Sequence, residues 1–236
     1  MVSSERWSRT DIRRALAITG IIAGGLAFDQ LADFWGQTLT NLGIWAALLY
    51  WMRAARSDDQ LALATCVAYA TAGEIFLSLV WGLYEYRLAN VPLFVPPGHA
   101  LLFMLGRIIA EHMDEWIEWM VPLAAAPFIL LLAFTGIGTL DALLFALFML
   151  CLLSGRASRL YAVMFVLSLA MEIYGVWLGN WAWAPEAPWL GFTTLNPPLA
   201  AGAFYCMLDM LVVATVAGLR PGAASVAPRL AAVRIR

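Results

Sequence analysis

Apolar segments long enough to cross a lipid bilayer follow one another along almost the whole chain. A membrane-spanning helix needs about 20 predominantly apolar residues. Of the 236 residues, 63% are hydrophobic and only 13% are charged, whereas roughly 25% are charged in an ordinary soluble domain. A soluble fold of this length has too little interior to bury so much apolar surface. The sequence therefore predicts an all-α integral membrane protein and excludes a cytosolic enzyme, a secreted disulfide scaffold and a disordered chain.

Eight segments fit this description, with seven as the alternative because the sixth is short. They cover residues 12–32, 38–55, 60–83, 95–112, 117–137, 139–155, 159–179 and 197–219. Only Gly136-Ile137-Gly138 separates the fifth from the sixth, which predicts a tight hairpin. No small-x-small cleavage pattern follows the first apolar stretch, so we interpret it as an uncleaved span.

The distribution of positive charge favours eight spans with both termini in the cytoplasm. All fourteen basic residues are arginine, and cytoplasmic loops of membrane proteins are enriched in Lys and Arg. With the N-terminus inside, only Arg87 falls on the outer side, whereas seven spans would place a whole group of arginines there. We therefore expect a bacterial inner-membrane protein whose last residues, 221–236, form a flexible cytoplasmic tail.

Several classes of membrane protein are excluded by the residues that the chain lacks. A retinal protein needs a lysine for its Schiff base, and this chain has none. His99 and His112 are too few for a histidine-rich di-iron site, and about 20 Å of helix separates them, too far to ligate one haem iron. The chain carries no phosphate-binding loop, HExxH motif, Ser-His-Asp pattern or metal-type cysteine spacing. The sequence therefore predicts no cofactor, no metal and no nucleic-acid partner.

A weak internal repeat divides the chain into two halves. In each copy a mid-helix glutamate is followed nine to twelve residues later by an aromatic-x-aromatic element, then by a Pro-containing linker and a Pro-Pro pair. The copies are Glu74, Tyr84-Glu85-Tyr86 and Pro96-Pro97, then Glu172, Trp181-Ala182-Trp183 and Pro197-Pro198. Chance likeness is the alternative, because interfacial aromatics and helix-start prolines are common. The matched glutamates favour two parallel four-helix repeats, residues 1–116 and 117–220, about an axis normal to the membrane.

Ionisable side chains inside the predicted spans are the candidate functional residues. A charged group at the bilayer centre costs about 2.5–3.5 kcal/mol on insertion scales, so such residues usually serve a function. The candidate catalytic residues are Glu74, Glu172 and Asp209, in the outer half or middle of their spans, and His99, near the outer start of the fourth. Each could instead be a hydrogen-bonding residue that fixes helix packing. Asp141 is expected to cap the sixth span in water or headgroups.

Buried acids without metal or nucleotide motifs suggest carbocation chemistry. Burial favours the protonated form of a carboxylic acid, and such an acid can protonate a carbon–carbon double bond. Aromatic faces stabilise the resulting cation, and a second carboxylate can orient water or remove a proton. The aromatic residues expected to bind substrate are Trp81, Tyr84, Tyr86, Trp177, Trp181 and Trp183. Hydration, cyclisation or isomerisation of an isoprenoid lipid follows this logic, which would make the enzyme a lyase or an isomerase.

Two patches of the sequence resemble the membrane carotenoid-biosynthesis proteins that hydrate the end groups of acyclic carotenoids. The first is the pattern Glu…Gly-x-x-x-Tyr…Val-Pro-Leu-x-Val-Pro, which runs from Glu74 to Pro96. The second contains residues 178–183, residues 188–192 and Asn196. Together they cover about a quarter of the chain, which differs from the family in the Pro-Pro-Gly-His helix start that includes His99. The resemblance implies a polyene or isoprenoid substrate, water as co-substrate and no cofactor.

Two other classes of function stay open at this level. Intramembrane glutamates and parallel repeats also suit a proton-coupled transporter of lipids or small molecules. A non-catalytic subunit that binds lipid or pigment in a membrane complex would use the same aromatic residues without chemistry. All three readings accommodate a homo-oligomer.

Overall fold

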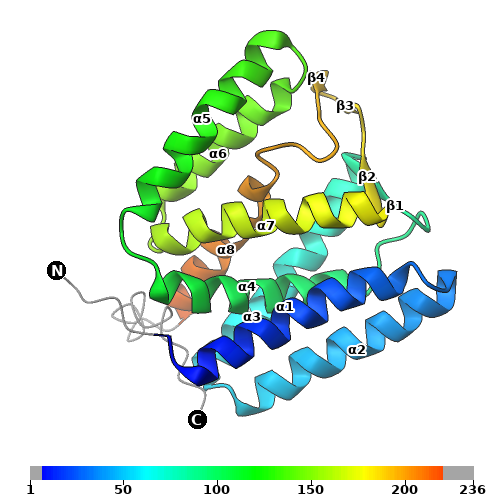
Figure 1. The fold of residues 1–236 in the computed structure, drawn as a ribbon, viewed down its shortest axis with the longest axis vertical. Coiled ribbons are helices and arrows are strands. Elements are labelled where there is room, and N and C mark those ends of the chain that lie inside the picture. The colour runs from blue at the N-terminus through cyan, green and yellow to red at the C-terminus, as the bar shows by residue number, and fades with distance from the viewer. Residues whose placement is uncertain (1–6, 220–236) are drawn as a thin grey trace.

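Helices account for 75% of the fold. The computed structural model describes residues 7–219, and each of the eight predicted apolar segments overlaps one α-helix of that part of the chain (Figure 1). The helices are α1 (Arg9–Asp29), α2 (Asp33–Ala54), α3 (Ser57–Glu74), α4 (Val95–His112), α5 (Ile117–Thr135), α6 (Thr139–Ser154), α7 (Ser158–Leu178) and α8 (Gly202–Leu219). The predicted tight hairpin between α5 and α6 is confirmed, since Gly136 ends α5 in the left-handed conformation at φ 73°. The predicted tail, 221–236, lies outside the described residues.

Four of the described helical segments are long and apolar enough to cross a membrane. They are α3 with its continuation to Val80, α5, α7 and α8, while α6 is apolar but short. Polar side chains interrupt the others, for example Arg13 and Arg14 in α1 and Arg107 in α4. The fold is therefore compatible with a membrane protein. Eight helices are present in the described residues, four of them with the length and composition of a span, and eight spans stay a prediction.

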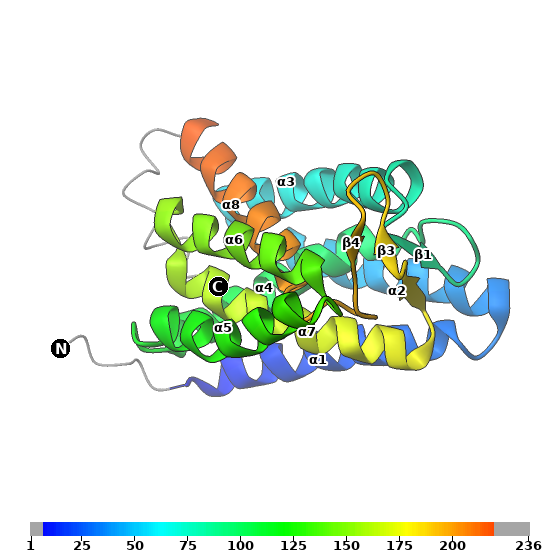
Figure 2. The ribbon, with the colours of Figure 1, turned by 90° about the horizontal axis from the view of Figure 1, so that it is seen from above.

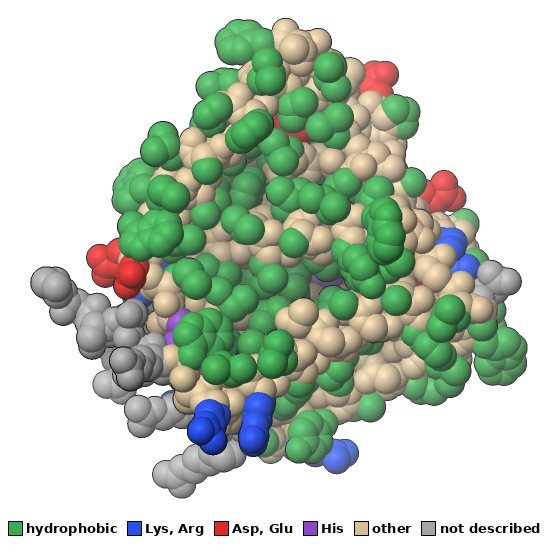
Figure 3. Space-filling model, viewed as in Figure 1, with side chains coloured by type: hydrophobic (Ala, Val, Ile, Leu, Met, Phe, Trp, Pro, Cys, Tyr) green, Lys and Arg blue, Asp and Glu red, His purple; other side chains and the backbone are tan. Residues whose placement is uncertain are grey.

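The outer surface of this bundle is largely apolar. Figure 3 shows hydrophobic side chains spread over α5, α6 and α7, with most charged side chains near the margins of the view. Phe128, Leu131 and Phe134 of α5 and Trp177 of α7 are all exposed. Soluble monomers rarely present so continuous an apolar surface, and contact with lipid would cover it.

The third apolar segment changes its winding directly after Glu74. It continues from α3 as a π-helix, η1 (Ile75–Val80), and then turns at Gly82, whose φ is 74°. Single π-helical turns within α-helices occur frequently at functional sites. The wider turn also alters which later side chains share a face with Glu74.

Short strands in the two interhelical linkers correct the all-α expectation. β1 (Tyr84–Tyr86) pairs antiparallel with β2 (Trp181–Trp183), and β3 (Glu186–Ala187) pairs with β4 (Phe192–Thr193). In the first pair Tyr84 lies opposite Trp183, and Tyr86 lies opposite Trp181. Alternating aromatic residues favour extended backbone that is buried on one face. The aromatic-x-aromatic elements of the two predicted repeats therefore bind each other.

Four helices form the centre of the fold, with the strand pair at one of its ends, and the other four helices pack around them. α3 and α4 pack together, as do α7 and α8, and the pairs contact each other through α3 with α8 and α4 with α7. α1 and α2 pack on α4, whereas α5 packs on α7 and α6 packs on both α7 and α8. The start of α1 and the end of α8 lie at one end of the molecule, opposite β1 and β2 (Figures 1 and 2).

Asp141 does not face water or headgroups as expected. Its side chain is fully buried, and Oδ1 accepts a 2.6 Å hydrogen bond from the backbone N–H of Ala200. Because the segment before α8 folds back over the start of α6, the carboxylate ties these two segments together. Its role in the fold is therefore to fix the start of α8.

The close approach of α7 and α8 predicts the effect of one substitution. A Cβ atom at Gly202 would lie 2.4 Å from the carbonyl oxygen of Phe165 and 2.8 Å from its Cα. Overpacking of this kind typically costs about 1–3 kcal/mol, so we expect Gly202→Ala to lower the free energy of unfolding by that amount. Reversible unfolding in bicelles or mixed micelles measures it. Gly43→Ala is the control, because nothing lies within 4 Å of its Cβ position; equal stability of the two variants would contradict the packing.

Candidate functional site

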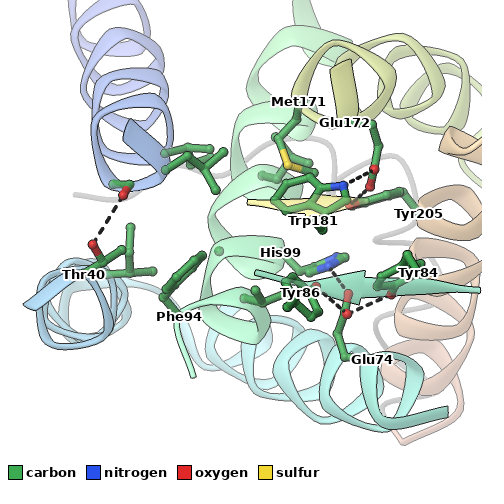
Figure 4. A pocket seen from close by; sticks show the side chains of 17 residues that line it. Thr40, Glu74, Tyr84, Tyr86, Phe94, His99, Met171, Glu172, Trp181 and Tyr205 are labelled. Atoms are coloured by element: carbon green, nitrogen blue, oxygen red, sulfur yellow. Dashed lines mark hydrogen bonds and ion pairs between the residues drawn. The ribbon is translucent and has the colours of Figure 1, made fainter. Parts of the chain in front are cut away.

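Glu74, the last residue of α3, is buried and holds three polar neighbours. Its Oε2 accepts hydrogen bonds from the hydroxyls of Tyr84, at 2.8 Å, and Tyr86, at 2.6 Å. Its Oε1 lies 3.0 Å from Nε2 of His99. The tyrosines come from β1 and the histidine from the first turns of α4, so the chain that follows Glu74 folds back to surround its carboxylate (Figure 4).

The hydroxyls of Tyr84 and Tyr86 both act as hydrogen-bond donors to this carboxylate. Burial, reinforced by the nearby charge of Glu74, raises the pKa of Tyr84 and of Tyr86 well above the usual tyrosine range. Both hydroxyls therefore keep their protons at any physiological pH. Each can stabilise a negative charge on Glu74 by donating to it.

Glu172 repeats this arrangement in α7 with a different set of donors. Its Oε2 accepts from the indole nitrogens of Trp181, at 2.8 Å, and Trp183, at 3.1 Å. Its Oε1 accepts from the hydroxyl of Tyr205 on α8, at 2.8 Å. Gly175 makes room for this geometry, because a Cβ atom there would lie 2.0 Å from the ring of Trp181. Each carboxylate is thus held by one aromatic strand and by one ring of the following helix.

The two carboxylates belong to one site. The rings of His99 and Tyr205 stack on each other with their centroids 4.6 Å apart and an interplanar angle of 13°. The pairing of β1 with β2 brings the remaining donors together from the other side. A continuous contact therefore runs from Glu74 through His99 and Tyr205 to Glu172 (Figure 4).

The donors differ between the two carboxylates. An indole N–H only donates, whereas a tyrosine hydroxyl or a histidine ring can both donate and accept. Oε2 of Glu172 is therefore fixed as an acceptor by its two tryptophans, while its Oε1 faces the hydroxyl of Tyr205. Oε1 of Glu74 faces a histidine ring nitrogen, which can either donate a proton to the carboxyl group or accept one from it. In addition, Nδ1 of His99 is buried without a hydrogen-bond partner in the described part of the chain, which leaves capacity for a ligand or water.

Two cavities reach the carboxylates from different sides. Five residues line both cavities: Glu74, Tyr84, His99, Glu172 and Tyr205. The smaller cavity has a volume of about 50 Å³, and its other walls come mainly from α1, α2, α4 and α7 (Figure 4). The larger cavity has a volume of about 350 Å³ and extends between α3 with η1 and α8.

The structure brings together seven of the ten residues that the sequence predicted for the site. They are Glu74, Glu172, His99, Tyr84, Tyr86, Trp181 and Trp183. Asp209, Trp81 and Trp177 line neither cavity. Asp209 is buried one turn beyond Tyr205 on α8, away from the strands, and its Oδ2 has no partner among the described residues.

Helix geometry explains why the two tryptophans lie elsewhere. Trp177 follows Glu172 by five residues, which at 3.6 residues per turn places it on another face, and its side chain is 76% exposed. Trp81 would return to the face of Glu74 in a regular α-helix, but the π-helical turns of η1 rotate it away. Its indole nitrogen donates instead to the carbonyl oxygen of Pro188, at 2.6 Å, and its ring stacks on Trp189.

Tyr205 is a residue of the candidate site that the sequence analysis did not select, although it is a hydroxyl-bearing ring in the first turns of α8. The repeat did not align it with His99, because extra residues separate the second Pro-Pro pair from α8. Thr40, Phe94 and Met171, which line the smaller cavity, carried no sequence signal of their own.

Comparisons of the chain with protein-family models, with curated proteins and with solved structures found no match. Among residues 7–219, no group of three or more His, Cys, Asp and Glu side chains is arranged to hold a metal ion. Function therefore has to be inferred from the geometry of the site itself.

The hydrogen bond between Tyr205 and Glu172 predicts a loss of stability when it is removed. Tyr205→Phe keeps the ring that stacks on His99 but leaves Oε1 of Glu172 without its donor. A buried acceptor deprived of its partner costs about 1–3 kcal/mol, and we expect the unfolding free energy to fall by this amount. Tyr50→Phe, at an exposed position, is the control. If both variants unfold at the same temperature in lipid nanodiscs, the hydrogen bond does not hold the carboxylate.

Proposed function

We propose that this protein is a cofactor-independent membrane enzyme that adds or removes protons at a carbon–carbon double bond of an isoprenoid or carotenoid lipid, by hydration or cyclisation. The observation that carries the proposal is the convergence of Glu74 and Glu172 on one buried, aromatic-lined site. Paired acids among aromatic rings are the groups that carbocation chemistry requires. The resemblance of the two sequence patches to acyclic carotenoid hydratases points to the same substrate class.

The larger cavity supports a lipid substrate. Away from the carboxylates its walls are apolar, with Phe76 and Leu77 on η1 and Phe204, Leu208 and Leu211 on α8. Phe76 and Leu211 are also exposed on the outer surface. Both bordering helical segments have the length and composition of membrane spans. A molecule that fills this cavity would therefore come from the bilayer rather than from water, and a long apolar chain fits that description.

One hydrogen bond limits the cavity at its far end. The hydroxyl of Tyr69, which lines the cavity on α3, lies 2.8 Å from the hydroxyl of Thr215 on α8. The two helices are thereby tied together beyond the site. A chain bound between them would lie with its reactive part beside Glu74 and Glu172.

The donor sets suggest how the reaction would proceed. The Glu74–His99 pair can exchange a proton without losing partners, so it would deliver the proton to one carbon of the double bond. The cation left on the other carbon would face the Glu172 carboxylate and the rings of Tyr84 and Tyr205. In hydration, water forms the new C–O bond and returns one proton to the pair. In cyclisation, a second double bond of the same chain attacks the cation, and a neighbouring C–H bond loses the final proton.

The arginines support the placement in the membrane that the sequence predicts. The α2–α3 and α6–α7 connections carry Arg53, Arg56, Arg156 and Arg159 and lie at the same end as the start of α1, away from β1 and β2 (Figures 1 and 2). That end would face the cytoplasm of a bacterial cell. In this placement all eight helices span the inner membrane as two parallel repeats, with the strand pair toward the outer side.

A proton-coupled transporter is the second candidate, and Asp209 favours it. An intramembrane carboxylate that is buried away from the main site and leaves one oxygen without a partner in the described chain is typical of a proton path. A transporter would lose its activity when the proton gradient is collapsed, whereas the proposed enzyme would not. A non-catalytic pigment-binding subunit would bind the lipid and leave its mass and structure unchanged.

The proposal predicts a new lipid product. In a bacterial host that makes lycopene and other acyclic isoprenoids, expression of the chain should yield a product heavier by one water, or one of equal mass with a different retention time. General acid–base groups contribute about 10²–10⁴-fold to rates, so Glu74→Gln and Glu172→Gln should each lower product formation by at least about 10²-fold. Liquid chromatography with mass spectrometry measures both.

Glu85→Gln is the matched control for this experiment. Glu85 lies between Tyr84 and Tyr86 but is exposed and points away from the site. Its variant should form product at the wild-type rate. If the wild-type chain is abundant in the membrane and changes no isoprenoid, or if the three variants behave alike, the proposed reaction is wrong.

A further inference from the structure

Buried polar atoms without protein partners gather at the strand end of α1 and α2. They are Oδ1 of Asp29, Nε2 of Gln30, Oδ1 of Asn41 and Oδ1 of Asn180, within the described part of the chain. Buried polar groups that lack a protein partner are ordinarily satisfied by ordered water. This end of the molecule therefore has the composition of a hydrated region, in contrast to the apolar walls between η1 and α8.

This polar region adjoins the smaller cavity. The side-chain amide of Asn180 donates to Oδ2 of Asp29, at 2.9 Å, and to the carbonyl oxygen of Leu26, at 3.1 Å. Leu26 is itself a wall residue of the smaller cavity. Thr40, the residue before Asn41, lines the same cavity (Figure 4). The unpartnered polar atoms thus lie within one or two helical turns of the cavity.

The size of the smaller cavity, and the polar groups at its Glu74 and His99 end, suit water better than a lipid chain, although its other walls are mostly apolar. A water molecule needs at least about 10–15 Å³ of cavity volume and two to four polar partners, so about 50 Å³ holds a few waters. Glu74 and His99 offer such partners, and Nδ1 of His99 has none in the described protein, while Thr40 lies at the opposite wall of the cavity (Figure 4). The larger cavity, seven times the volume, has the apolar walls that a chain needs.

We propose that the smaller cavity is the water site of the enzyme, filled from the polar end of α1 and α2. The larger cavity would hold the lipid chain, so that the two reactants meet at Glu74 and Glu172 from different sides. This inference rests on the proposed function and deepens it, because it selects hydration. Water oxygen bonds to the carbon cation formed by proton addition, and one water proton returns to the Glu74–His99 pair. Without water, the cation would lose a proton from a neighbouring carbon and leave a double-bond isomer.

Three glycines allow each cavity to be filled separately. Gly98 lines the smaller cavity and Gly73 the larger, and nothing lies within 4 Å of a Cβ atom at either position. Gly43 is equally open but lines neither cavity. Gly98→Leu should displace water, Gly73→Leu should displace the chain, and Gly43→Leu controls for the substitution itself.

Radiolytic footprinting tests the water site without any substrate. Hydroxyl radicals formed by X-rays from bound water oxidise nearby methionines, and Met171 and Met207 are both partly buried, one in each cavity. In nanodiscs, Met171 should oxidise several-fold faster than Met207. Gly98→Leu should lower the rate at Met171 several-fold and leave Met207 unchanged, and Gly43→Leu should alter neither. Equal rates at the two methionines, or no effect of Gly98→Leu, would overturn the proposal.

Product analysis then links the water site to the reaction. Gly98→Leu should still consume the isoprenoid but form the double-bond isomer in place of the hydrated product, while Gly73→Leu should stop consumption. If Gly98→Leu abolishes lipid binding and Gly73→Leu does not, the chain occupies the smaller cavity and the assignment is wrong. If the wild-type protein forms no product, the proposed function is wrong. The footprint tests the water site whether or not a product forms.

Discussion

Hydrogen bonds stabilise a carboxylate that is buried inside a protein, and two carboxylates held in this way lie at the centre of the fold. Isolated ionised groups are so costly to bury that they persist only with partners. Glu74 and Glu172 each contact three polar side chains. Those partners come from β1, β2, α4 and α8, so the antiparallel strand pair and the four central helices are all tied to the two carboxylates. The remaining helices support this centre from outside.

The two halves of the chain surround their glutamates with different side chains. The first half supplies two tyrosines and a histidine to Glu74, whereas the second supplies Tyr205 and two tryptophans, which can only donate, to Glu172. The two cavities differ as well, because α1 and α2 contribute walls to the smaller cavity, whereas α3, η1 and α8 line most of the larger one. The two carboxylates are therefore held by similarly placed contacts that come from different donors.

Local sequence signals predicted the helices and most of the site. Apolar runs located all eight helices, because the length and the hydropathy of a segment are local properties. The matched positions of Glu74 and Glu172, and the aromatic pairs that follow them, identified six site residues, and the ionisable side chain near the start of the fourth segment identified His99. These predictions depended on spacing within one half of the chain.

What the sequence did not reveal depends on contacts between the halves or on departures from regular helix geometry. The pairing of Tyr84 with Trp183 joins residues almost 100 positions apart, and nothing local specifies it. The π-helical turns after Glu74 rotate Trp81 out of the site, and the irregular start of α8 hides the equivalence of Tyr205 and His99. The prediction for Asp209 rested on its depth in the membrane alone. In the structure Asp209 lies one helical turn beyond Tyr205 and lines neither cavity.

The central claim is that Glu74 and Glu172 act as one coupled unit. A double-mutant cycle measures this directly, with the unfolding free energies of the wild-type chain, Glu74→Gln, Glu172→Gln and the double variant determined in the same lipid environment. Residues that share a hydrogen-bond network show interaction energies of about 0.5–3 kcal/mol, and we predict a value in that range. Effects that add to within about 0.3–0.5 kcal/mol, as for distant independent residues, would show that the two carboxylates belong to separate sites.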